Sequence, residues 1–294
     1  MKRVVALVLG FVMLMLSCAF VAVSDDKETE DIEFYLHDDY IVKNESEYNA
    51  KMLDYASQLF TRVYEEQLSS SNDVYFALIP DKHRIVNGVV DYKSFLKYME
   101  SSLPFAETIE IAQLLTLSDY YKTDPHWKQE CIVDVAKTLC ESMGTSVDTE
   151  FKTISINAPY NGVYVEQSGL HTSSDVLNYL EWDGLDAVLL EGANAVYDVD
   201  KFYDDDPYDV FLSGNQSIVK IKNQTIENEK RLVIFRDSFG SSIAPIMSTA
   251  YSEIVLIDLR YIMSESLSEY VDFENADVLF LYSTLLLNNS MSMK

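Results

Sequence analysis

The residue with the clearest chemistry is Ser238, in the segment 237–240 (Asp-Ser-Phe-Gly), which directly follows the apolar run 232–235. A short apolar run that ends in a turn is typical of a strand buried on both faces of a parallel sheet. Open α/β sheets bind ligands at the carboxyl ends of such strands. A helix is predicted from about residue 243, and its free amide groups would favour negative charge near the serine. This position suits a nucleophile; the alternative is that Asp237 and Ser238 only cap the helix.

One histidine stands near a carboxylate and beside an aromatic residue, in the segment 124–127 (Asp-Pro-His-Trp). His126 follows Asp124 and Pro125, and Asp124 can cap a helix that has proline at its first position. That helix is predicted to run through Leu139. The side chains of Asp124 and His126 can then gather at its open end, although His126 alone is also typical of a polar surface histidine.

The remaining histidines and cysteines do not indicate a metal site or a cofactor. The four histidines show no spacing such as His-x-x-x-His; they are His37, His83, His126 and His171. No cysteine spacing fits a metal site. Cys131 and Cys140 would lie about 13 Å apart in one helix, too far for a disulfide, so both are predicted to be small core residues.

The elements that must position these residues alternate between helices and strands. Apolar residues at helical spacing predict helices over 51–67 and 92–103, and residues 81–84 are predicted as a polar loop. Apolar runs predict strands at 73–80, 109–115, 187–191, 196–199, 208–215, 217–222, 232–235, 253–261 and 277–282. This alternation predicts a single α/β domain over residues 51–294 with a mostly parallel sheet.

Composition excludes one class of function. The chain has 294 residues and a formal net charge of −26, with no basic cluster. A nucleic-acid-binding protein needs a basic surface, so no nucleic-acid partner is expected. The acidic residues are interpreted as a solvated surface.

The amino terminus is predicted to be a targeting segment, residues 1–24, followed by a polar tether over 25–50. Lys2 and Arg3 precede an apolar run from Val4 to Ala22, which is typical of a secretory signal. Cys18 also fits a bacterial lipoprotein signal imperfectly, and a segment of this length can just span a bilayer as an uncleaved anchor. All three interpretations place the domain outside the cytoplasm, with membrane contact only through this segment.

Three segments follow one another in a recognisable order. Residues 120–127 end in Asp-Pro-His-Trp, residues 211–215 end in Ser-Gly-Asn, and residues 235–240 contain Asp-Ser-Phe-Gly. The third segment is followed by Asp-Leu-Arg-Tyr at 258–261. In this order they resemble the DHHW family of exported bacterial proteins, which is similar to the SGNH-like domains of alginate and peptidoglycan O-acetylation proteins. The resemblance spans residues 74–290 and implies an SGNH-hydrolase-like three-layer sandwich. Pro125 replaces the first histidine of the family's Asp-His-His-Trp.

The resemblance also implies roles for individual residues. Ser238 would be the nucleophile, His126 its base and Asp124 the residue that orients the imidazole, in the logic of a Ser-His-Asp triad. Gly214 and Asn215 resemble the Gly-Asn element that helps to form an oxyanion hole together with the Ser238 backbone amide.

Arg260 resembles an arginine near the active site of the acetylation relatives, where it would contact a substrate. The alternative is that Arg260 is a charge at the end of a strand that pairs with Asp258.

Two functions remain open from sequence. The first is an exported serine O-acetyltransferase or esterase that acts on a cell-envelope or extracellular polysaccharide; transfer would require a separate membrane protein as acetyl donor. The second is a non-catalytic polysaccharide-binding or assembly protein, for which Trp127, Tyr160 and Tyr164 would form a stacking cleft; the alternative is that these aromatic residues belong to the core. A metal-dependent hydrolase is disfavoured by the histidine spacing.

Overall fold

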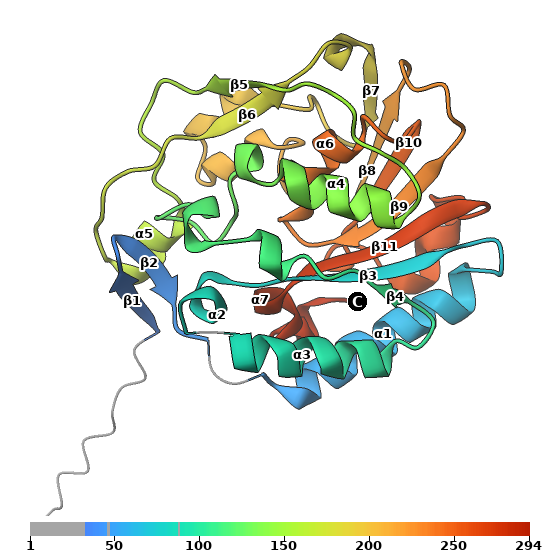
Figure 1. Cartoon of the computed structure of the whole chain (residues 1–294), viewed down its shortest axis with the longest axis horizontal. Coiled ribbons are helices and arrows are strands. Elements are labelled where there is room, and N and C mark those ends of the chain that lie inside the picture. The colour runs from blue at the N-terminus through green and yellow to red at the C-terminus, as the bar shows by residue number, and fades with distance from the viewer. Residues whose placement is uncertain (1–32, 46–47, 88) are drawn as a thin grey trace, which may run out of the picture. The chain divides into compact units, whose positions relative to one another are not determined.

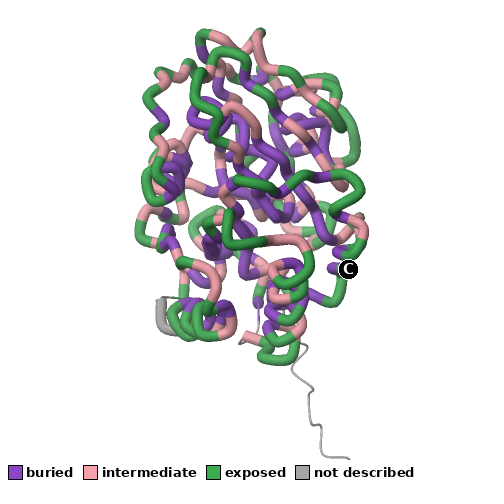
Figure 2. Tube along the Cα trace, turned by 90° about the vertical axis from the view of Figure 1, so that its right-hand side faces the viewer, coloured by how far each residue is buried: buried purple, intermediate pink, exposed green. Residues whose placement is uncertain are grey.

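The computed structural model describes residues 33–45, 48–87 and 89–294, and residues 33–294 form one compact unit. The chain builds a mixed α/β structure around one central sheet, with helices above and below it (Figure 1). In Figure 2 the buried residues gather along the middle of the molecule, and the exposed residues lie mainly in the outer loops and on the outer sides of helices.

The central sheet has seven strands. Their spatial order is β4 (Glu107–Thr108), β3 (Val74–Ile79), β11 (Ala276–Ser283), β9 (Arg231–Arg236), β10 (Glu253–Ile257), β8 (Ile218–Asn223) and β7 (Val188–Glu191). The first five strands are mutually parallel, β8 is antiparallel to β10, and β7 is antiparallel to β8. The predicted mostly parallel sheet is therefore confirmed.

Helices cover both faces of this sheet because its central strands are apolar on both sides. On β9, Leu232 and Ile234 face one core and Val233 and Phe235 face the other. The helices on the Val233 face are α1 (Ala50–Gln67) and α3 (Val89–Ser102), and those on the Leu232 face are α4 (Val133–Ser142) and α6 (Gly240–Met247).

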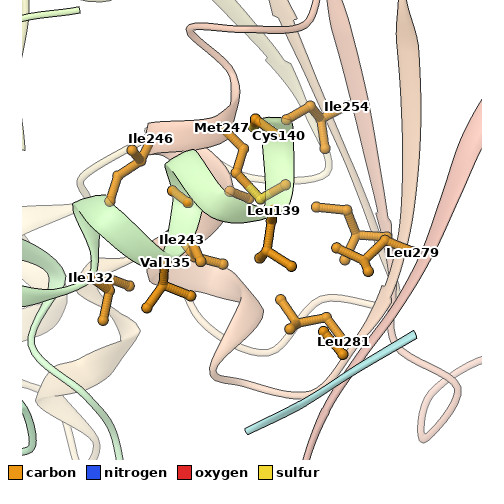
Figure 3. Packing of buried hydrophobic residues seen from close by; sticks show 14 of the residues in the cluster. Ile132, Val135, Leu139, Cys140, Ile243, Ile246, Met247, Ile254, Leu279 and Leu281 are labelled. Carbon is orange, nitrogen blue, oxygen red and sulfur yellow. The ribbon is translucent and has the colours of Figure 1, made fainter. Parts of the chain in front are cut away.

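Helices α4 and α6 pack against each other on the Leu232 face of the sheet, over the strand that precedes Ser238. Leu139 of α4 and Ile243 of α6 point toward each other and toward Leu279 and Leu281 of β11 (Figure 3). All four side chains are fully buried. Because protein cores are closely packed, this contact fixes the position at which α6 begins after β9.

The segment predicted as a tether is structured in part. Strands β1 (Phe34–His37) and β2 (Tyr40–Lys43) form a hairpin, and the backbone N–H of Ile41 donates to the carbonyl of Lys122 at 2.8 Å. The tether prediction is therefore wrong for residues 34–43, because apolar residues of this hairpin pack on the domain. Residues 1–24, the predicted targeting segment, lie outside the described residues. Within the described part of the chain, no helix is both long and apolar enough to cross a membrane.

Several local predictions differ from the structure. Residues 109–115 contain a 3₁₀ turn (Ala112–Leu114) in place of a strand, and residues 82–87 form helix α2 in place of a loop. Residues 125–128 are not helical, and α4 begins only at Val133. Residues 208–215 contain a 3₁₀ turn (Pro207–Val210) and an irregular turn in place of a strand. Residues 196–199 contribute only one isolated bridge.

Smaller elements complete the fold. They are β5 (Lys152–Ser155), α5 (Val163–Ser168), β6 (Asn178–Glu181) and α7 (Thr284–Leu287). Strands β5 and β6 pair with each other and lie outside the central sheet. Cys131 and Cys140 are both free; Cys140 is buried as predicted, whereas Cys131 is only partly buried.

Candidate active site

Ser238 lies at the carboxyl end of β9, in a turn that the preceding aspartate holds in place. One carboxylate oxygen of Asp237 accepts from the backbone N–H of Phe239 at 3.0 Å. The other accepts from the backbone N–H and the hydroxyl of Ser283, at 2.9 and 2.6 Å. Asp237 thus ties the turn to the end of β11, and no side chain caps helix α6. The Ser238 hydroxyl is therefore free for another partner.

That partner is His126. The Nε2 atom of His126 lies 2.7 Å from Oγ of Ser238, although the two residues are 112 positions apart in sequence. The Nδ1 atom of the same ring lies 2.6 Å from Oδ1 of Asp124. A proton on Nδ1 can be donated to the carboxylate, which leaves Nε2 to accept the serine proton. The structure thus brings the three predicted residues together in the geometry that activates a serine.

Asp124 is fully buried and satisfied by several donors. Its Oδ1 also accepts from the backbone N–H of His126 at 3.0 Å, and its Oδ2 accepts from the backbone N–H of Val163 at 3.2 Å. Burial alone would raise the pKa of Asp124, but the adjacent His126 outweighs this effect and lowers it. Asp124 is thus held ionised next to the imidazole, in a tight turn rather than as the predicted helix cap.

The segment before Asp124 is held by a second buried carboxylate, Asp175. It accepts from the backbone N–H of Lys122 at 3.0 Å, and from the backbone N–H and the hydroxyl of Thr123 at 3.0 and 2.8 Å. The hydroxyl of Thr123 in turn accepts from the backbone N–H of Gly162 at 2.9 Å. No sequence pattern pointed to Asp175 or Thr123, because they act through distant partners.

Gly214 and Asn215 lie at the same edge of the sheet as Ser238, because β8 begins three residues later and pairs with the end of β10. Leu212, Ser213 and Gly214 have φ values of 55°, 58° and 84°, so the chain makes a left-handed turn just before Asn215. Such unfavourable backbone conformations persist where surrounding structure enforces them, often at functional sites.

The amide groups of this region differ in their availability. The backbone N–H of Gly214 donates to the carbonyl of Phe211 at 3.2 Å, so it is already used. Within the described residues, neither the backbone N–H of Ser238 nor the exposed side chain of Asn215 makes a hydrogen bond. The oxyanion role of Gly214 and Asn215 stays a prediction, and of the two groups only the Gly214 N–H is already bonded.

Arg260 pairs with Asp258, as the alternative interpretation expected. Its Nε donates to Oδ1 of Asp258 at 2.9 Å and its Nη2 donates to Oδ2 at 2.6 Å. Buried Arg236 also reaches this carboxylate, with Nη1 at 3.5 Å from Oδ2. A contact of Arg260 with a substrate stays a prediction; its side chain is 22% exposed.

Solved structures share this architecture. A DHHW family protein from Eubacterium siraeum superposes with a TM-score of 0.65 at 19% identity and covers 89% of this chain and 96% of its own. Bacillus cereus PatB1 with a sulfonyl adduct gives a TM-score of 0.71 at 18% identity, covering 86% of this chain and 95% of its own. The chain has the fold of a DHHW family protein.

The O-acetyltransferase domain of Pseudomonas putida AlgJ also shares this DHHW-type fold, with a TM-score of 0.51 at 13% identity over 87% of this chain and 92% of its own. No protein-family model matches the chain, and no curated protein matches it in sequence. The predicted resemblance is therefore confirmed at the level of the fold.

In this DHHW-type fold, aromatic residues join the segment that carries His126 to the segment that carries Ser238. The indole N–H of Trp127 donates to the carbonyl of Phe239 at 3.2 Å and to the hydroxyl of Ser242 at 2.9 Å. The ring of Tyr208 stacks on the imidazole of His126, with centroids 3.7 Å apart and planes 5° apart. The Tyr208 hydroxyl lies 2.7 Å from that of Ser242. The residues that follow His126 and Ser238 are thus bonded to each other.

The predicted stacking cleft is wrong. Trp127 and Tyr160 are fully buried and Tyr164 is 4% exposed, so these rings belong to the core and its borders. Tyr208 and Ser242 carry the contacts to the site, and no spacing in the sequence pointed to them. Within the described residues, no group of three or more His, Cys, Asp or Glu side chains could hold a metal ion.

Lys82 bonds to the backbone of the segment that precedes Asp124. Its ammonium donates to the carbonyls of Tyr121 and Lys122, at 3.0 and 3.3 Å, and lies 4.9 Å from the ring centroid of Tyr164. Burial lowers the pKa of Lys82 from 10.5 to about 7, although the nearby carboxylates of Asp124 and Asp175 oppose this shift.

The lowered pKa of Lys82 predicts a specific pH dependence of stability. Below pH 7 the lysine is protonated in both the folded and the unfolded chain; between pH 7 and 10.5 only the unfolded chain keeps the proton. The free energy of unfolding therefore gains a contribution that rises with pH across this window. Urea denaturation from pH 6 to 9 should show the wild type gaining stability relative to Lys82→Met as the pH rises. A constant difference between the two proteins would contradict this prediction.

Proposed function

We propose that this protein is an exported serine acyl-transfer enzyme, an O-acetyltransferase or esterase that acts on a cell-envelope or extracellular polysaccharide. The observation that carries the proposal is the 2.7 Å contact between Ser238 and His126, with Asp124 on the other ring nitrogen. The shared fold with an O-acetyltransferase domain supports acyl transfer as the reaction. The seven-stranded sheet with helices on both faces is consistent with an SGNH-like three-layer sandwich.

The first half of the proposed reaction forms an ester on Ser238. As Oγ of Ser238 attacks the carbonyl carbon of the acyl donor, Nε2 of His126 takes the hydroxyl proton and Asp124 stabilises the resulting imidazolium. The free backbone N–H of Ser238 and the side chain of Asn215 would stabilise the oxyanion. The imidazolium then gives its proton to the leaving group as the donor bond breaks.

The second half returns the enzyme to its starting state. His126 takes a proton from an acceptor hydroxyl, which attacks the acyl group and releases Ser238, and the imidazolium protonates the serine oxygen. A sugar hydroxyl as acceptor gives transfer, and water gives hydrolysis. For transfer, the acetyl donor would be supplied by a separate membrane protein, and the amino-terminal segment would direct export or, through Cys18, lipid anchoring.

The test is to detect the acyl-enzyme directly. Purified protein is treated with p-nitrophenyl acetate, and intact mass and nitrophenol release are followed. We expect one acetyl group per chain on Ser238 of the wild type. In Ser238→Ala the adduct should be absent, and turnover should fall by at least about 10³-fold. Ser268→Ala, at an exposed serine, is the matched control. A folded wild type without adduct or turnover would favour the non-catalytic binding or assembly protein.

A further inference from the structure

A groove runs along the free edge of the central sheet, beside strand β7. It has a volume of about 460 Å³ and is lined by β7, by Tyr179 and Glu181 of β6, and by the loop 193–197, which includes Asn194 and Tyr197. Pockets of about 300–1,000 Å³ are typical of sites for small molecules and short segments of longer chains. Strand β7 pairs with β8 on one side only, so the groove lies at an edge that no strand of the sheet covers.

The groove leads toward the triad. Strand β7 is antiparallel to β8, and β8 is antiparallel to β10, which is parallel to β9. The chain therefore leaves β7 at the same edge of the sheet at which it leaves β9, with strands β10 and β8 between the two. The loop 193–197 begins there, and the backbone N–H of Asn194 donates to the hydroxyl of Ser213 at 3.0 Å, just before Gly214 and Asn215.

A single buried glutamine joins the groove to α6, the helix that follows Ser238. The side-chain N–H₂ of Gln129 donates to the hydroxyl of Tyr197 at 3.2 Å and to the carbonyl of Ser242 at 2.7 Å, and its oxygen accepts from the backbone N–H of Leu180 at 2.8 Å. Gln129 is fully buried and lies two residues after Trp127. One side chain thus bonds both to the wall of the groove at Tyr197 and Leu180 and to the helix that follows Ser238.

The lining of the groove combines aromatic rings with polar groups. Tyr179 and Tyr197 lie with their ring centroids 4.7 Å apart and their planes at 33°. Tyrosine offers an apolar ring and a polar hydroxyl on one side chain. The C–H face of a sugar can pack on such rings, while its hydroxyls can donate to the side-chain oxygen of Asn194 and to the carboxylates of Glu181 and Asp186.

The charge of the groove limits what can bind. Glu181 and Asp186 form no ion pair within the described residues, and no lysine, arginine or histidine lines the groove. On the neighbouring strand, Lys220 pairs with Glu191 at 3.4 Å. Like charges across an interface cost free energy, and the whole chain has a net charge of −26, so a polyanion would be repelled.

We propose that this groove binds the polysaccharide on which Ser238 acts, and that this polysaccharide is a glycan without acidic groups. The proposal rests on the proposed acyl-transfer function for its biological meaning, but it concerns binding alone. It is therefore tested in Ser238→Ala, in which no acyl-enzyme can form and no product can accumulate.

The experiment is a calorimetric titration of Ser238→Ala with two oligosaccharides of equal length. One is the neutral hexamer of N-acetylglucosamine and the other is an alginate hexamer, which carries a carboxylate on each sugar. We expect the neutral hexamer to bind at least about 10-fold more tightly than the alginate hexamer. Adding Glu181→Gln and Asp186→Asn should reduce this preference by strengthening alginate binding.

Substitutions in the groove locate the binding site. Tyr179→Ala should weaken binding of the neutral hexamer by about 10-fold or more, as truncation of an aromatic contact residue commonly does. Tyr197→Phe keeps the ring, loses the hydroxyl bonded to Gln129 and should cause a smaller loss. Tyr203→Ala, at a tyrosine that is 77% exposed outside the groove, is the matched control and should have no effect.

Three results would overturn the proposal. They are alginate binding equal to or tighter than neutral binding, no binding of the neutral hexamer, and equal affinities of the Tyr179→Ala and Tyr203→Ala variants. None of these depends on whether Ser238 becomes acylated. Failure of the groove is therefore distinguishable from failure of the proposed acyl-transfer function, which the acetyl-adduct experiment decides.

Discussion

Asp124→Asn is expected to lower turnover of an acetyl ester by about 10⁴-fold while leaving the fold intact. The amide can still accept from the backbone N–H of His126, but it cannot stabilise an imidazolium or favour the Nδ1–H tautomer. The corresponding substitution in a serine protease has an effect of this size. The measurement is kcat for nitrophenyl acetate hydrolysis, with thermal unfolding as the control for folding.

The same variant separates the proposed enzyme from a binding protein that retains the fold. If Asp124 only supports the turn, Asp124→Asn should change stability without changing how fast Ser238 is acylated. An acylation rate within a few-fold of wild type, measured by intact mass over time, would therefore contradict the proposed triad.

Gly162→Ala is expected to lower kcat by about 10²-fold through Asp124. The backbone at Gly162 has a φ of −78°, which any residue adopts. A Cβ atom there would lie 2.3 Å from Cβ and 2.5 Å from Oδ2 of Asp124, so the carboxylate must move. A displacement of about 1 Å at a catalytic group can cost about 10²-fold in rate. The measurement is kcat for the acetyl ester together with the free energy of unfolding.

A second glycine of the same helix provides the matched control. Gly169 ends α5 with a φ of 66°, and an added Cβ there meets no atom within 4 Å. Gly169→Ala should therefore cost about 1 kcal/mol of stability through backbone strain and leave kcat unchanged. Equal losses of activity in both variants would point to general destabilisation and would contradict a specific effect on Asp124.

Sequence periodicity predicted the sheet because burial of a strand depends mainly on its own residues. The apolar runs at 232–235 and 278–282 have no polar face that water could cover, so they form most of the central strands β9 and β11. The turn at Asp237–Gly240 was also predictable, because its residues are typical of the end of a buried strand. Position 240 must be glycine, because a Cβ atom there would lie 2.7 Å from Cβ of Arg236.

Local patterns misled where distant partners decide the conformation. Asp124 and Pro125 carry the signals of a helix start, yet the Asp124 carboxylate bonds to the His126 backbone and ring and to Val163. Residues 208–215 are apolar enough for a strand, but Tyr208 and Phe211 are buried in a separate cluster beside the sheet. Burial of this kind removes apolar residues from water without any ladder of strand hydrogen bonds.

By itself, the sequence determined the mostly parallel α/β class, the place of Ser238 after a buried strand, and His126 and Asp124 as its candidate partners. Only the tertiary structure decided that Ser238 and His126 lie 2.7 Å apart, that Tyr208 stacks on the imidazole, and that Arg260 pairs with Asp258. Hydrophobic periodicity reports which face of an element is buried. It carries no information about which residue, 112 positions away, lies opposite that face once the core has packed.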